Sequence, residues 1–132
     1  MTASPVLTQT PICKDIQVST ANTNRDGATG TYSAAYTVGA NGALIDYIAF
    51  QAQVTSAAGL LRIFVSTDGG ATFNLYKEVA TVGATVSGTV GGERQVWIPD
   101  GGIPWAVPGN AQIKFNVNNA ETWNAWICGG SF

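Results

Sequence analysis

Acid–base chemistry in this chain of 132 residues would depend mainly on its eight carboxylates, because the sequence contains no histidine. Histidine is the commonest general base and zinc ligand, so its absence removes His-based triads and the usual zinc sites. A glycosidase needs two carboxylates that face each other across a cleft, whereas nearly all of these acids fall in predicted turns or at strand ends. The sequence also lacks G-x-S-x-G, P-loop and C-x-x-C motifs, so we predict a protein that is not an enzyme and needs no metal or cofactor. The eight acids are Asp15, Asp26, Asp46, Asp68, Glu78, Glu93, Asp100 and Glu121.

Two cysteines, Cys13 and Cys128, lie near opposite ends of the sequence. A disulfide between them would close most of the chain and stabilise it by about 4–5 kcal/mol in the chain-entropy description. The alternative is a pair of reduced thiols that pack as small hydrophobic side chains. Residues 1–20 lack a basic segment followed by an apolar one, which is the pattern of a secretion signal, so the sequence favours reduced thiols.

The four tryptophans are the residues best suited to binding a partner or a sugar. Trp97 and Trp126 are predicted on the strand faces opposite the core, where they could form a sugar-binding platform or an interface. Aromatic residues are enriched in interface cores, so we favour contact with a subunit or partner over sugar binding. Trp105 and Trp123 are predicted to pack in a loop and in the core.

A turn motif occupies residues 66–73, STDGGATF. It matches the pattern S-x-D-x-G-x-T-F/W, which resembles the Asp-box hairpins of sialidase-like propellers. Asp68 can accept hydrogen bonds from backbone N–H groups of its own turn, and Gly70 can take a positive φ. We predict a structural turn built by Ser66, Asp68, Gly70 and Thr72, and we place a calcium or ligand loop second.

The elements that would position these residues are short strands. From residue 31 onward apolar and polar residues alternate with a period of two, and turn signals recur every 8–12 residues. This pattern predicts an all-β fold, an antiparallel two-sheet sandwich of about eight strands, with a jelly roll favoured. Residues 31–132 form the predicted sandwich, and residues 1–30 are either an extended N-terminal arm or a first strand plus a loop. The predicted core consists of Tyr36, Ile48, Phe50, Ile63, Val65, Val96, Ile113, Phe115, Val117 and Ile127.

Charge and hydropathy exclude two classes of partner. Charged residues make up 11% of the chain, the net charge is −2, and six basic residues are spread singly along the sequence. Such a distribution offers no basic patch for nucleic acid. No apolar run approaches the roughly 20 residues of a membrane helix, so we expect no membrane partner.

Two stretches resemble a known group of proteins. Residues 45–79 contain an apolar strand, then TSAAGLLRIF, a D-G turn and LYKEV; residues 118–124 read NNAETWN, before a Gly-Gly-Ser-Phe end. Both resemble small head-decoration and head-fibre-type proteins of tailed bacteriophages and prophages. The TSAAG segment has one extra alanine, and the Asp-box turn is longer than the family's D-G-T turn. The resemblance implies a β-sandwich virion protein, assembled in the host cytoplasm, that decorates a capsid or forms the base of a head fibre. Its implied partner is the major capsid protein or another head protein.

The expected contact surface is drawn from aromatic residues on outer strand faces. A small sandwich would leave them in water, and large exposed apolar patches usually mark interaction sites. We therefore expect a homo-oligomer, with a homotrimer favoured by the resemblance, attached to the phage head through residues 1–30. The alternative is a carbohydrate-binding or host-attachment module that uses exposed tryptophans. The predicted contact residues are Tyr47, Phe64, Tyr76, Trp97 and Trp126.

Overall fold

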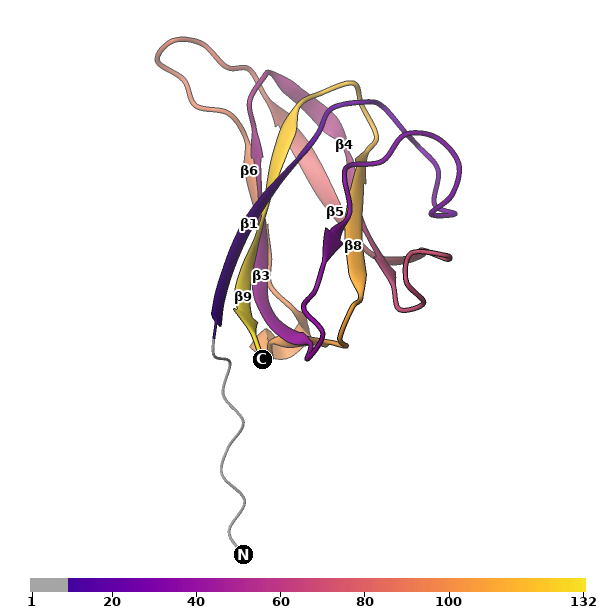
Figure 1. Cartoon of the computed structure of the whole chain (residues 1–132). Helices are drawn as coiled ribbons and strands as arrows, with labels where there is room; N and C mark the ends of the chain where they lie inside the picture. The colour runs from indigo at the N-terminus through magenta and orange to yellow at the C-terminus, as the bar shows by residue number, and fades with distance from the viewer. Residues whose placement is uncertain (1–9) are drawn as a thin grey trace, which may run out of the picture.

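The computed structural model describes residues 10–132, which form two antiparallel sheets packed face to face (Figure 1). One sheet has the order β1-β9-β3-β6, and the short strand β7 pairs with the other end of β3. The other sheet has the order β2-β8-β4-β5. The predicted all-β, antiparallel two-sheet sandwich is therefore confirmed. The strands are β1 (Thr10–Val18), β2 (Tyr36–Thr37), β3 (Ala43–Ala52), β4 (Ser56–Ser66), β5 (Asn74–Ala84), β6 (Arg94–Trp97), β7 (Trp105–Val107), β8 (Gln112–Val117) and β9 (Trp123–Ser131).

The core lies between the two sheets. Alternation of apolar and polar residues turns one face of each strand inward, and the rings of Phe50 and Phe115 meet edge to face at 5.5 Å between their centroids. Trp123 is fully buried in the same core cluster, as predicted for core packing. Seven predicted core residues are buried, and Tyr36 and Val65 pack partly buried against them. The seven are Ile48, Phe50, Ile63, Ile113, Phe115, Val117 and Ile127.

Val96 is the predicted core residue that the structure contradicts, because it is 47% exposed. Its neighbour Trp97 points inward and pairs with Ile48, while Val96 pairs with Ala49 on the outer face. Successive residues of a strand face opposite ways, so only one of the two can enter the core. Burial of the larger indole removes more apolar surface from water, and that gain favours this orientation.

Two bulges redirect side chains along otherwise regular strands. The pairing of β3 with β9 skips Asp46, so both Ile45 and Ile48 face the core and the carboxylate stays outside. The pairing of β4 with β5 skips Tyr76 in the same way. Each bulge inserts one extra residue and so reverses the inward and outward positions beyond it.

Residues 10–30 belong to the sandwich rather than to a free arm. β1 pairs with β9 along its whole length, and the segment that follows runs over the outer face of the four-stranded sheet (Figure 1). The backbone N–H of Asn22 donates to the carbonyl of Val117 at 2.8 Å, and that of Ser33 donates to Phe115 at 2.8 Å. Of the two alternatives for residues 1–30, the described part is thus a first strand plus a loop. The rest of the predicted anchor, residues 1–9, lies outside the described residues.

Candidate functional site

Two of the predicted contact residues, Tyr47 and Trp126, are exposed and lie close together on the outer face of the five-stranded sheet. Tyr47 of β3 and Trp126 of β9 are each 39% exposed. Trp126 pairs with Ala49, and Tyr47 pairs with Cys128, so their side chains occupy neighbouring rows of one face. We call this surface the outer aromatic face. It consists of Cys13, Asp15, Tyr47, Ala49, Arg94, Val96, Trp126 and Cys128.

A shallow hollow of about 220 Å³ opens on this face, among aromatic, thiol and guanidinium groups. Ala49 is the smallest residue of its lining, and its side chain is buried beneath larger neighbours. The hollow offers apolar contact area and one positive charge, from Arg94, but no carboxylate. Such a lining suits binding better than acid–base chemistry.

Opposite charges mark the two edges of the outer aromatic face. Asp15 lies on β1 at one edge, and Arg94 lies on β6 at the other. Neither takes part in an ion pair within residues 10–132, where the ion pairs join Arg25 and Arg62 to Glu78. Both charges therefore remain available to a partner.

Trp97 and Tyr76 lie elsewhere, in an aromatic cluster with Trp105. The rings of Tyr76 and Trp105 stack at 4.1 Å with an interplanar angle of 13°, and Trp97 meets each of them edge to face at 5.7 Å. The cluster joins β5 of one sheet to β6 and β7 of the other. The expectation that Trp97 is an exposed contact residue is wrong, since only 7% of it is accessible. Tyr76 stays exposed, but its ring face is already occupied by Trp105.

Phe64 is also not a surface residue. It lies on the outer side of β4 as predicted, yet it is fully buried, because Tyr32 of the covering loop packs edge to face against it at 5.2 Å. Lys114 caps this small second core: its Nζ lies 3.9 Å from the centre of the Tyr32 ring and donates to the carbonyl of Gly27 at 2.8 Å. The sequence of this loop is polar, so it did not predict that the loop would cover the sheet.

The residues of the predicted turn form a closed hydrogen-bonded unit. Oδ1 of Asp68 accepts hydrogen bonds from the Ser66 hydroxyl at 2.7 Å and from the backbone N–H of Thr72 at 2.9 Å. The Ser66 hydroxyl in turn accepts from the N–H of Gly70, whose φ is +90°. The bonds from Ser66 and Thr72 hold the pKa of Asp68 below its ordinary value. The side chains thus serve the turn itself. Across residues 10–132, no cluster of three or more Cys, Asp or Glu is placed to hold a metal ion.

Glu93 is a buried acid whose role the sequence does not reveal. Its Oε1 accepts from the Ser56 hydroxyl and the Gly83 N–H, and its Oε2 accepts from the Val82 N–H and the Gln95 amide, all at 2.8 Å. Burial, the largest single influence, raises the pKa, but the four hydrogen bonds together hold the pKa of Glu93 below its ordinary value. One of the partners lies 37 residues away, so no local pattern distinguishes Glu93 from a solvated acid.

Glu121 joins residues 118–124 to residues 55–59. Its carboxylate accepts from the backbone N–H of Ala57 at 2.6 Å and from the indole N–H of Trp123 at 3.1 Å. Beside it, the Asn119 amide donates to the carbonyl of Ala58 at 3.2 Å. The acid of the NNAETWN segment therefore fixes the TSAAG segment in place, which is a structural role.

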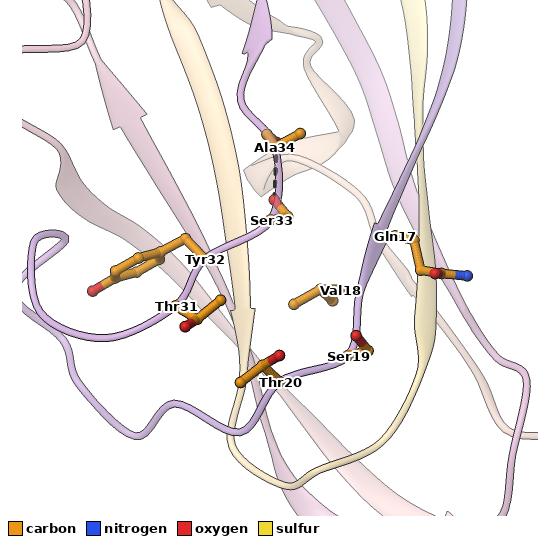
Figure 2. Close-up of a pocket in the computed structure, with 8 residues that line it drawn as sticks. All are labelled: Gln17, Val18, Ser19, Thr20, Thr31, Tyr32, Ser33 and Ala34. Carbon is orange, nitrogen blue, oxygen red and sulfur yellow. Dashed lines mark hydrogen bonds between the residues drawn. The ribbon is translucent and has the colours of Figure 1, made fainter.

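A second, smaller cavity of about 140 Å³ lies between the end of β1 and residues 31–34 (Figure 2). Val18 lies between the two segments, while Gln17 and the Tyr32 ring point away from it. Its polar groups are chiefly the hydroxyls of Ser19, Thr20, Thr31 and Ser33, and it contains no carboxylate, lysine or cysteine. The lining places no carboxylate or lysine beside these hydroxyls to act as a general base.

Comparison with known proteins found no protein-family model and no curated protein that matches this chain. Within residues 10–132 no helix is long and apolar enough to cross a membrane.

Proposed function

We propose that this chain is a non-enzymatic structural protein of a tailed-phage head, which binds the major capsid protein or another head protein through the outer aromatic face. The observation that carries the proposal is the exposed apolar surface of Tyr47, Trp126 and Val96. These residues lie on a sheet whose other face packs against the core. Exposed apolar patches on folded domains mark interaction sites, and rigid aromatic side chains provide contact area at a small entropic cost. Binding to another protein through this surface requires no catalytic group.

The phage assignment is supported by the sequence resemblance of residues 45–79 and 118–124. In the structure these stretches meet at Glu121, whose carboxylate bonds Ala57 and Trp123. The residues that resemble the phage proteins therefore support a shared sandwich fold. By analogy with those proteins, we propose the same role, on a capsid or at the base of a head fibre. The proposed place of the protein is the virion, after assembly in the host cytoplasm.

The strand orders favour the jelly-roll topology within the sandwich. Strands of the first half pair with strands of the second: β1 with β9, β2 with β8, β3 with β6 and β7, and β4 with β5. This nesting is what results when one long hairpin folds over into two facing sheets, as in capsid and lectin jelly rolls.

We further propose that the protein is a homo-oligomer, with a trimer favoured by the resemblance. Asp15 and Arg94 lie at opposite edges of the outer aromatic face, so one copy can place its acid against the base of the next. The apolar rows between them supply the area that would be buried. Electrostatic complementarity of this kind fixes orientation more than affinity.

The test removes the aromatic groups and measures both kinds of association. In a double variant, Tyr47→Ser with Trp126→Ser, we expect binding to purified capsids to weaken at least tenfold and light scattering to show a smaller species. Val82→Ser is the control, because Val82 is 75% exposed but lies on β5, outside this face. Full capsid binding by the folded double variant would contradict the proposal.

The anchoring hypothesis now narrows to residues 1–9, because residues 10–30 are folded into the sandwich. Deletion of residues 2–9 leaves β1 intact, so its effect on capsid binding can be separated from an effect on folding. We expect the deletion to weaken binding; unchanged binding would assign attachment to the outer aromatic face alone.

Carbohydrate binding is the second candidate, and one observation favours it. The row next to Trp126 carries amides: Gln17 donates to Asn124 at 3.3 Å and to Gln53 at 2.9 Å. An exposed indole beside amides is a pattern that stacks against sugars and bonds their hydroxyls. Titration with a glycan panel tests it: saturable binding that Trp126→Ser abolishes, without capsid binding by the parent protein, would replace the structural role with this one.

A further inference from the structure

Cys13 and Cys128 face each other across the β1–β9 pair. They are register partners, although 115 positions separate them in the sequence, and their sulfur atoms lie 3.4 Å apart as free thiols. Cys13 is exposed, and both residues line the hollow of the outer aromatic face. Cys13 is therefore within reach of small molecules in solution, and the buried Cys128 lies next to it.

We propose that Cys13 and Cys128 are a reversible disulfide site, which closes when the folded chain meets a small-molecule disulfide such as oxidised glutathione. The strand register and the sulfur positions support this proposal, which concerns the chain while no other molecule covers the outer aromatic face. It also resolves the two alternatives left open by the sequence, because the same pair can exist in both states.

The geometry requires only a small adjustment. A disulfide has a sulfur–sulfur bond of about 2.05 Å and Cβ atoms about 3.5–4.5 Å apart, whereas opposed residues of antiparallel strands have Cβ atoms about 4.5–5.5 Å apart. The strands must therefore approach by about 1 Å. β1 can move this far because it is an edge strand, which among residues 10–132 pairs with β9 alone.

The reaction balances through thiol–disulfide exchange. The thiolate of Cys13, the exposed residue, attacks one sulfur of oxidised glutathione, forms a mixed disulfide and releases one glutathione thiolate. The thiolate of Cys128 then attacks the Cys13 sulfur, closes the Cys13–Cys128 bond and releases the second glutathione. The two protein thiols lose two protons and two electrons, and oxidised glutathione becomes two reduced molecules.

The first step should be slow at neutral pH and faster in alkali. The hydrogen bond with Cys128 raises the pKa of Cys13, helped by desolvation of the thiol beside Cys128 and by the negative charge of Asp15. Tyr47 of β3 and Arg94 of β6 are the other ionisable side chains that face this hollow. The thiolate is the attacking species, and a raised pKa leaves little of it at pH 7. More thiolate forms at pH 9, so the reaction is faster there.

Closure would constrain nearly the whole chain. The linked residues are 115 positions apart, and long closed loops restrict the unfolded state most. We expect the melting temperature to rise by about 10 °C or more, and the rise to disappear on reduction.

The experiment incubates the native protein, diluted until light scattering gives the mass of a single chain so that no second copy covers the thiols, with oxidised glutathione at pH 7 and pH 9. The reaction is stopped with iodoacetamide at intervals. Intact mass, peptide mapping and non-reducing gels identify the product, and thermal melts follow with and without dithiothreitol. Cys13→Ser and Cys128→Ser are matched controls, since each leaves one thiol in the same surroundings.

The expected product is a monomer chain that has lost two hydrogens, contains a Cys13–Cys128 linked peptide and melts higher, and that forms faster at pH 9. The single variants should retain a glutathione adduct or a free thiol, with no rise in melting temperature. A persistent glutathione adduct on the parent protein, a disulfide between two chains, or two thiols that stay free would each overturn the proposal. None of these outcomes changes the capsid-binding test above.

Discussion

Glu93 is the residue whose environment most constrains its chemistry, because four donors from the three strands β4, β5 and β6 surround one buried carboxylate. Replacing it by glutamine keeps the size but places an amide N–H₂ group where one oxygen accepted two hydrogen bonds. We predict that Glu93→Gln lowers the free energy of unfolding by about 2–3 kcal/mol, measured by urea denaturation. Asp100→Asn, at an exposed position in a one-turn 3-10 helix, is the control and should change stability by less than about 0.5 kcal/mol. Equal effects of the two substitutions would contradict this role of Glu93.

The lowered pKa of Glu93 also predicts how stability depends on pH. A carboxyl group whose pKa is lower in the folded state than in the unfolded state stabilises the protein at higher pH, and this contribution is lost as the pH falls from about 4.5 through the folded-state value. The free energy of unfolding should therefore decrease with acidification below about pH 5. In Glu93→Gln the decrease should be smaller, since the contribution of Glu93 is removed while Asp26 and Asp68, whose pKa values are also lowered, still contribute. Parallel curves for the two proteins would contradict the prediction.

Residue-level prediction succeeded where a side chain's environment is local, and failed where it depends on distant segments. The Asp68 turn is a local hydrogen-bond pattern, and its partners could be named from the sequence. The burial of Phe64 depends on Tyr32, and that of Trp97 on Trp105 and Tyr76, which no strand periodicity specifies. The outer aromatic face could be predicted only in part, through Tyr47 and Trp126.

At the scale of elements, the pairing of β9 with β3 depends on a glycine. A Cβ at Gly129 would overlap the carbonyl oxygen of Leu44 and would lie 2.9 Å from the Cα of Ile45, next to the bulge at Asp46. We predict that Gly129→Ala separates the two strands and lowers the free energy of unfolding by about 2–4 kcal/mol. Gly88→Ala is the matched control, because no atom lies within 4 Å of its added Cβ, and it should be neutral or slightly stabilising. Equal melting temperatures for the two variants would contradict the prediction.

The strands could be predicted from the sequence, because alternation of apolar and polar residues indicates a strand with one buried face. The bulges were not, since an inserted residue reverses the pattern without an unusual residue type to mark it, as at Tyr76. The sequence also did not predict that residues 19–35 cover the outer face of the four-stranded sheet. The loop is anchored by backbone bonds to Val117 and Phe115 and by the buried amide of Asn22, which donates to Thr29 and Thr31 at 3.1 and 3.0 Å.

The molecule as a whole is held by pairings between distant parts of the chain, with β4–β5 as the innermost hairpin and β1–β9 as the outermost pair. Folds dominated by such non-local pairings fold slowly, in roughly milliseconds to seconds. We predict single-exponential refolding in this range, monitored through the fluorescence of the fully buried Trp123 in stopped-flow dilution from urea. Refolding within microseconds would contradict it.

The position of β9 between β1 and β3 bears on how the chain is made. During translation β1 and β3 emerge well before β9, and the place between them stays empty, with its ladder of N–H and C=O groups unpaired. The nascent chain can form the β4–β5 hairpin early, but it cannot complete the five-stranded sheet. Folding of this sheet must therefore wait until β9 has left the ribosome, and a chain that stalls before residue 123 carries two open strand edges that invite pairing with other chains.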